Sequence, residues 1–300
     1  MTFSIVAVDR ESKEVGFAIA SCSWDAGQVA FARAELGAIA SQAKGNLDFL
    51  GRYFELLPGA DNGEEVLKAF RAQDDEFETR QVGLAALTHA PVAFTGSQCS
   101  PWAGHTTGLD YACQGDILAG PQVIEAMATA FEKTEGSLFE RLFAALHAGD
   151  QAGGDLRGRQ SARLCVMKRG WGQPGTHTQI DLVIPDHDDP VAEMGRVLGV
   201  RGHLVTIFGL LGEAASAERT ACVEALDRLA EFLSDKLEPR YLDWWETLAD
   251  RYFAQGEVEK AESAYRTYLG INPALKTVLA ADAINGSFPE ELARRLKLLD

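Results

Sequence analysis

The chain has 300 residues, of which 46% are hydrophobic and 24% charged, and its formal net charge is −16. This composition is typical of a soluble globular protein, and the length suggests one large or two moderate domains. The acidic balance, without any cluster of Lys and Arg, excludes the usual surface of a nucleic-acid partner.

Neither a membrane span nor a secretion signal is expected. No apolar run approaches the ~20 residues of a transmembrane helix, and the first residues lack a basic segment followed by an apolar one. The five cysteines are scattered without a Cys-x-x-Cys pair, which indicates reduced thiols that serve packing. The acidic run 186–189 lacks the ligand spacing of a closed metal site. We therefore predict a cytoplasmic protein with no membrane partner, no metal and no cofactor.

The chain opens with a predicted hairpin. Residues 2–8 and 15–21 are almost continuously apolar and flank a polar turn, which predicts two antiparallel strands covered on both faces. Residues 29–34 and 37–43 supply two further strands. Helices are predicted over about 47–57 and from Asn62 to about residue 70. Asn62 and Glu65 have the spacing of a helix cap.

A second round of strands and helices follows. Strands are predicted at 81–87, 92–95 and 111–114, with a loop rich in Gly, Ser and Pro over 96–108. Pro121 opens a helix that continues to about residue 131, and Ser137 with Glu140 forms a capping box for helix 138–147. A glycine-rich segment, 153–162, feeds strands at 163–168 and 180–184. The order predicts an α+β fold with two stacked antiparallel sheets, each covered by a helix pair, in a four-layer αββα sandwich.

Past Asp186 the predicted strands end. Helices are expected at 191–200 and 218–237, and residues from Trp245 to Pro273 fit the spacing of one tetratricopeptide unit at about 242–275. A single unit cannot bury a continuous core, so it packs on flanking helices or pairs with another copy. We divide the chain into a domain of residues 1–198 and a small all-α domain of residues 199–300.

Thr2 is the first candidate for chemistry. Removal of Met1 would give Thr2 a free α-amine with a pKa of roughly 7.7 to 8.0, beside its own hydroxyl. The two groups form a minimal nucleophile and general base. If Met1 stays, the nitrogen is an amide and cannot be the base. The structural alternative is that Thr2 is a β-branched residue that opens a strand.

The αββα order, the opening hairpin and the glycine-rich segment together resemble the N-terminal nucleophile hydrolases, which include proteasome subunits. The resemblance implies that Thr2 is the nucleophile. It further implies that Arg33 is the basic residue that tunes Thr2, where proteasome subunits use lysine, and that Asp155 and Ser161 orient the amine.

Residues 1 to about 198 more closely resemble a bacterial family called domain of unknown function 1028, which has no established activity. The family pattern leads us to expect asparagine at the position of Asp116. In this chain a neutral side chain that can donate a hydrogen bond has therefore been replaced by a carboxylate that accepts one. The motifs that carry the resemblance lie at residues 1–7, 41–43, 102–105, 114–121, 153–162 and 186–190. The substrate-binding residues that it implies are Ser41, Gln42, Trp102, His105, Gln114, Gly115, Asp116, Arg157 and Arg159.

In the catalytic interpretation, Thr2 Oγ1 attacks an amide or ester carbonyl and its own amine transfers the proton. Arg33 stabilises negative charge, and Gln114 with the Gly115 N–H donates to the oxyanion. In the structural interpretation, the polar residues of segment 153–162 form a turn network, and His105 is a turn histidine.

Two classes of function remain open. The first is a threonine amidohydrolase that acts on a small amide or peptide. The second is an inactive scaffold that binds a protein partner or self-associates through its C-terminal helices, with Trp244, Trp245 and Tyr252 as candidate contacts of a homo-oligomer.

Overall fold

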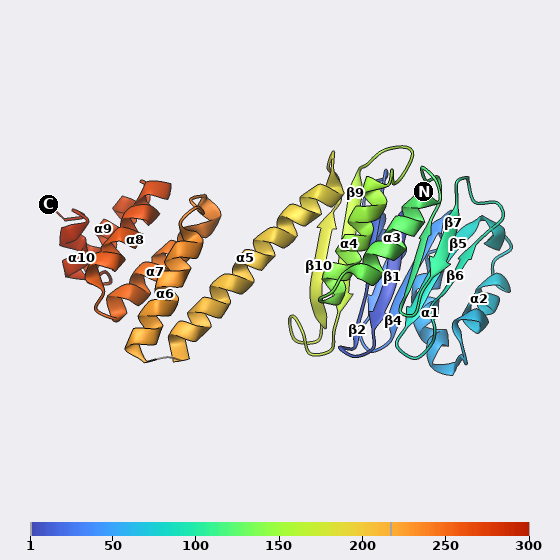
Figure 1. Ribbon diagram of the computed structural model, residues 1–300, viewed down its shortest axis with the longest axis horizontal. Coiled ribbons are helices and arrows are strands. Elements are labelled where there is room, and N and C mark those ends of the chain that lie inside the picture. The colour runs from blue at the N-terminus through green and yellow to red at the C-terminus, as the bar shows by residue number, and fades with distance from the viewer. Residues whose placement is uncertain (1, 217, 300) are drawn as a thin grey trace. The chain divides into compact units, whose positions relative to one another are not determined.

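Strands β1 (Phe3–Asp9) and β2 (Glu14–Ser21) lie at the centre of a six-stranded antiparallel sheet in the computed structural model, which describes residues 2–216 and 218–299 (Figure 1). The strand order in this sheet is β10-β9-β2-β1-β8-β7, and a second sheet has the order β3-β4-β5-β6. The other strands are β3 (Ala30–Arg33), β4 (Gly37–Ala43), β5 (Arg80–Ala86), β6 (Val92–Thr95), β7 (Gly104–Thr107), β8 (Tyr111–Gly115), β9 (Ser161–Met167) and β10 (Thr178–Ile184). The predicted α+β class with two antiparallel sheets is confirmed.

Three apolar clusters separate the layers of the first unit, Met1–Leu198. One lies between the six-stranded sheet and the helices α3 and α4, a second between the two sheets, and a third between the four-stranded sheet and α1 and α2. The four helices are α1 (Asp48–Leu56), α2 (Gly63–Arg71), α3 (Gln122–Lys133) and α4 (Leu138–Gln151). Both faces of the central strands are therefore covered, which explains their continuous apolar sequence.

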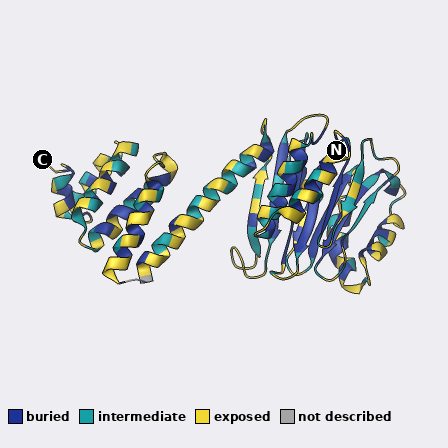
Figure 2. Cartoon of the chain, in the orientation of Figure 1, coloured by how far each residue is buried: buried dark blue, intermediate teal, exposed yellow. Residues whose placement is uncertain are grey.

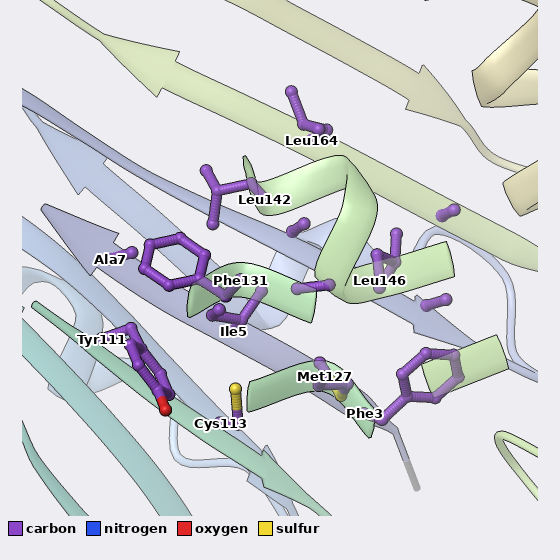
Figure 3. Close-up of a cluster of buried hydrophobic side chains, with 14 of the residues drawn as sticks. Phe3, Ile5, Ala7, Tyr111, Cys113, Met127, Phe131, Leu142, Leu146 and Leu164 are labelled. Carbon is purple, nitrogen blue, oxygen red and sulfur yellow. The ribbon is translucent and has the colours of Figure 1, made fainter. Parts of the chain in front are cut away.

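Figure 3 shows how β1 is held against its helix pair. Phe3, Ile5 and Ala7 alternate along the strand and point toward the helices, as the period of two requires. They meet Met127 and Phe131 of α3 and Leu142 and Leu146 of α4. The even-numbered residues consequently face the opposite way, toward the second sheet, and among them are Thr2, Ser4 and Val6.

Two helix caps predicted from the sequence are confirmed. The side chain of Asn62 accepts a hydrogen bond from Glu65 N at 3.1 Å, and Ser137 with Glu140 forms a reciprocal capping box. These caps satisfy amide groups that the first helical turn leaves without partners. Strand β7 differs from expectation, because it lies inside the predicted loop 96–108. Its sequence Gly-His-Thr-Thr is short, half exposed and without an apolar alternation.

The second unit, Gly199–Asp300, has an apolar core of its own. Trp245 and Tyr252 are only 7% and 3% exposed and belong to this core, whereas the sequence-based expectation placed them at a contact with a second copy. Trp244 is partly buried and packs edge-to-face on Phe208. The helices are α6 (Arg219–Leu233), α7 (Leu242–Ala254), α8 (Val258–Ile271), α9 (Leu275–Asn285) and α10 (Glu290–Arg295). A largely helical C-terminal region is thus confirmed.

Helix α5 (Pro190–Ser216) is much longer than the predicted segment 191–200. By length and composition alone, residues 190–215 could cross a membrane, with a mean hydropathy of 1.3 and 11% of the most apolar window buried. The expectation that no segment reaches this length is therefore corrected. Arg196 and Arg201 interrupt the apolar run in the sequence, but the mean hydropathy of the segment stays high enough for a membrane span. Figure 2 shows exposed residues along this helix, in contrast to the buried strands.

Candidate functional site

Thr2 precedes the first residue of β1 and lies next to the ends of two neighbouring strands. Phe3 pairs with Ala20 of β2 on one side and with Gly115 of β8 on the other. One step further along each ladder places Thr2 opposite Ser21 and Asp116. The strand register therefore brings Thr2, Ser21 and Asp116, which are distant in the sequence, together at the ends of three neighbouring strands.

Both polar groups of Thr2 are hydrogen-bonded, and the residue is 5% exposed. Thr2 N donates to Asp116 Oδ1 at 3.0 Å, and Asp116 N donates back to Thr2 O at 3.1 Å. Thr2 Oγ1 donates to Ser21 Oγ at 3.3 Å. The main-chain nitrogen and the hydroxyl of Thr2 thus each face a side chain capable of accepting a proton or a hydrogen bond.

Asp116 is a buried acid, 2% exposed. Burial raises the pKa of its carboxyl group above the ordinary value, and the hydrogen bond from Thr2 N partly opposes that rise. A positive charge on the Thr2 nitrogen would be held 3.0 Å from this carboxylate. The pocket around Thr2 N is consequently suited to an ammonium group as well as to an amide.

Arg157 supplies a positive charge beside this cluster. Its Nη2 donates to Ser21 Oγ at 3.4 Å and to Asp155 Oδ2 at 2.7 Å, and its Nε donates to Asp155 Oδ1 at 3.1 Å. The hydrogen bonds to Asp155 raise the pKa of the guanidinium further. Asp155 also accepts from Cys22 N at 3.1 Å. Hydrogen bonds thus connect Asp155 to Thr2 through Arg157 and Ser21.

Ser161 stabilises the turn that follows β2. Its hydroxyl donates to Ser23 O at 2.6 Å and accepts from Ala26 N at 2.8 Å. Ser23 Oγ in turn donates to Ser21 Oγ at 3.0 Å. The predicted pair Asp155 and Ser161 is brought to the neighbourhood of Thr2, with both residues holding the groups that surround Ser21.

A buried chain of amides lies between the two sheets, directly beneath Thr2. Gln42 Nε2 donates to Thr2 O at 3.0 Å and to Gln81 Oε1 at 2.8 Å. Ser4 Oγ donates to Gln42 Oε1 at 2.6 Å, and Gln114 Nε2 donates to Ser4 Oγ at 2.6 Å. The Gln114 amide is therefore occupied inside the sandwich and does not face outward as an oxyanion donor.

The same chain of amides continues to the surface. Gln81 Nε2 donates to Thr95 Oγ1 at 2.8 Å and to Gly115 O at 2.9 Å. Thr95 Oγ1 lies 2.8 Å from His105 Nδ1. Partial burial lowers the pKa of His105, which favours its neutral form. His105 is thus connected to Thr2 through three intervening side chains.

Arg33 does not belong to the cluster, contrary to the sequence-based expectation. It is exposed and ends β3 opposite Gly37, whereas the Thr2 contact in the same sheet is Gln42. Gln42 lies roughly 16 Å further along β4, at about 3.3 Å per residue. A different basic residue, Arg157, contacts Ser21, which is the partner of the Thr2 hydroxyl.

Two other predicted substrate-binding residues have structural contacts. Ser41 Oγ accepts from Asn46 N at 3.1 Å, at the end of β4. Trp102 O accepts from Leu118 N at 3.0 Å, and its ring covers Gly104, where a Cβ would come within 2.5 Å of the ring. Ser41 thereby fixes a turn, and Trp102 fixes the start of β7.

Arg159 lines a cavity of about 280 Å³ instead of the Thr2 cluster. Its guanidinium pairs with Asp150, with Nε to Oδ1 at 2.7 Å and Nη2 to Oδ2 at 2.9 Å. Phe3 and Ala20 form part of the same cavity. Ser21, Asp155 and Ser161 line it as well, so the cavity reaches the groups that surround Thr2.

Sequence reasoning missed Ser21, Gln81 and Asp150. Ser21 was within reach, because pairing the predicted strands 2–8 and 15–21 end to end places it opposite Thr2. Gln81 and Ser4 stand out as single polar residues in otherwise apolar strands, which is a signal for a buried polar contact. Within residues 2–216 and 218–299, no group of three or more His, Cys, Asp or Glu side chains is placed to hold a metal ion.

Comparison with known proteins concerns the first unit. The model of a family described as "Family of unknown function (DUF1028)" matches residues 2–194. Among solved structures, the chain is similar to protein SPO2555 from Silicibacter pomeroyi, assigned to the same family model, with 27% sequence identity and a TM-score of 0.60. The similarity covers 66% of this chain and 88% of that one. No curated protein matches the chain.

Proposed function

Because the chain belongs to the DUF1028 family, for which no activity is named, we propose its function from the Thr2 cluster: a threonine hydrolase that cleaves a small amide or peptide once Thr2 begins the chain. The observation that carries the proposal is the contact between Thr2 N and the buried Asp116 carboxylate at 3.0 Å. Met1 itself lies outside the described residues.

The proposed reaction uses groups that are already in contact. With Met1 removed, Thr2 Oγ1 attacks the substrate carbonyl carbon while the α-amine of Thr2 takes the hydroxyl proton. The amine then gives this proton to the leaving nitrogen, and water hydrolyses the acyl-enzyme. Ser21 holds the hydroxyl and is itself held by Arg157, and Asp116 holds the ammonium form of the amine.

The layers around the site support the proposal. Two sheets with helices on their outer faces fit the αββα architecture of the N-terminal nucleophile hydrolases, where a threonine at the start of the first strand is the nucleophile.

We also retain, as proposals, the tetratricopeptide-like unit at about 242–275 and the location in the cytoplasm.

A second function is favoured by the burial of Thr2. At 5% exposure, Thr2 leaves a substrate little room in the described conformation. A catalytically inactive scaffold, which binds a protein partner or a second copy through the helical unit, accounts for a closed site. The exposed helix α5 would then supply the contact in place of Trp245 and Tyr252.

Covalent labelling separates the two functions. Protein produced with Thr2 as its first residue is treated with a β-lactone, which acylates nucleophilic hydroxyl groups, and the modified residue is identified by peptide mapping. The hydrolase predicts one adduct on Thr2, absent from Thr2→Ala and from protein that retains Met1. The exposed control Thr88→Ala should keep the adduct. An unmodified Thr2 in the Thr2-initiated protein would instead support the scaffold.

A further inference from the structure

The cavity on the helix side of the six-stranded sheet has a mixed lining. Apolar side chains form one wall, where Phe3, Ala20 and Val191 belong to the core between the sheet and α3 and α4. Asp150 and Arg159 form a polar wall, and Ser21, Asp155 and Ser161 of the Thr2 cluster also line the cavity. The volume, about 280 Å³, lies just below the range of about 300–1,000 Å³ that is usual for small-molecule sites.

The polar wall presents a charged group that is fixed in place. The side chain of Asp150 is 4% exposed and holds Arg159 through two parallel hydrogen bonds, whereas the Arg159 side chain is 43% exposed. Because a paired guanidinium remains charged and cannot rotate freely, its orientation is settled before any ligand arrives. The apolar wall lies close by, formed by residues with no polar side-chain atoms.

Asp150 uses only one edge of the Arg159 guanidinium. The bonds involve Nε and Nη2, so the edge formed by Nη1 and the second hydrogen of Nη2 is left for another acceptor. Asp189 Oδ2 approaches Nη1 at 3.9 Å, which is beyond hydrogen-bond range. A planar carboxylate matches such an edge with two parallel hydrogen bonds.

We propose that this cavity binds a short aliphatic carboxylate, with its head on the second edge of Arg159 and its chain against Phe3, Ala20 and Val191. The site adjoins the Thr2 cluster, because Ser21, Asp155 and Ser161 also line the cavity. Binding of a carboxylate to Arg159 uses no group of Thr2, so the proposal holds whether or not Thr2 is a nucleophile.

Titration calorimetry on the full chain tests the proposal with pentanoate, pentanol and pentylamine at constant ionic strength. We expect pentanoate to bind at least tenfold more tightly than the other two. Arg159→Lys should weaken pentanoate binding at least tenfold, because a lysine offers a point charge and no second edge. Arg163→Lys is the matched control, since Arg163 makes the same two-bond pair with Asp181 outside the cavity.

Equal affinity for pentanoate in the wild type and in Arg159→Lys would overturn the proposal, as would equal affinity for pentanol. A measurement without any variant covers the case in which Arg159→Lys does not fold. In the wild type, affinity should rise from acetate to pentanoate as the chain covers the apolar wall. If acetate bound as tightly as pentanoate, the aliphatic chain would make no contact with the apolar wall and Arg159 would bind carboxylates as an exposed surface residue does. This result would also overturn the proposal.

Discussion

Asp116 is the residue on which the electrostatics of the site depend. A neutral asparagine at this position would still accept a hydrogen bond from Thr2 N. The carboxylate adds a negative charge in a buried place, and the hydrogen bond from an amide offsets the cost of this burial only in part, whereas an ammonium group offsets it more strongly. The effect of the same side chain therefore differs between the two forms of the chain, and this difference can be measured.

In protein that retains Met1, the free energy of unfolding should fall as pH rises and Asp116 ionises, and Asp116→Asn should remove this fall. Burial raises the pKa of Asp116 in the folded state above its ordinary value of 3.8, so the folded protein binds more protons than the unfolded chain between these two pKa values. The stability contributed by Asp116 therefore falls as pH rises through this window, by about 1.4 kcal/mol for each pH unit.

Urea denaturation between pH 3 and pH 8 would test this expectation. The gain in unfolding free energy from Asp116→Asn should grow with pH through the window and then stay constant, while the exposed control Asp188→Asn should show no such trend. A variant that is less stable than the wild type by the same amount at every pH would contradict the burial argument.

In Thr2-initiated protein, Asp116→Asn should shift the pH dependence of labelling at Thr2. The carboxylate stabilises the ammonium form of the amine, so its removal lowers the amine pKa and frees the base at lower pH. The rate of β-lactone labelling should thus reach half its maximum at a lower pH in the variant. A midpoint that does not move would mean that Asp116 does not contact the reacting amine.

The polar chain between the sheets is the element that connects Thr2 to its surroundings. Gln81 is fully buried, accepts from Gln42 and donates to Thr95 Oγ1 and Gly115 O. Gln81→Leu keeps a similar volume but leaves buried groups without partners. We expect a loss of about 1–3 kcal/mol in the free energy of unfolding.

Chemical denaturation measures this loss, with the exposed Gln28→Leu as the control, which should stay within about 0.5 kcal/mol of the wild type. A Gln81→Leu variant as stable as the control would show that the amide chain does not stabilise the sandwich.

Helix α5 carries glycines that its own contacts do not require. A Cβ added at Gly199 or Gly202 would meet nothing within 4 Å, whereas one added at Gly16 of β2 would come within 2.4 Å of Cys165 O. Because glycine costs a helix roughly 0.5–1 kcal/mol relative to alanine, Gly199→Ala and Gly202→Ala should each raise the stability of the second unit by about that amount.

Thermal unfolding of the full chain would show this increase, and Gly16→Ala should lower stability instead. A loss of stability in Gly199→Ala would contradict the free space around α5 and would indicate that another surface approaches this helix closely.

Over the whole molecule, the features that could be predicted are those set by neighbours in the sequence. The opening hairpin, the caps at Asn62 and Ser137, and the α+β class follow from patterns that span at most about twenty residues. Even the pairing of Thr2 with Ser21 is contained in the hairpin register.

The rest of the site depends on which distant strands become neighbours. Asp116 reaches Thr2 because β8 pairs with β1, and no local pattern specifies that pairing. Arg33 was placed by analogy with a lysine and lies at the far end of the β3 and β4 pair, because the register of these strands sets its position. The length of α5 was missed because its charged residues break the apolar run without breaking the helix.

The central claim is that Thr2 acts as a nucleophile with its own amine as the base, which requires the loss of Met1. Intact-mass spectrometry of untagged protein purified from its own cell tests this most directly, before and after treatment with the β-lactone. We expect a mass that lacks methionine and gains a single adduct, which Thr2→Ala abolishes. A mass that retains methionine and gains no adduct would contradict it.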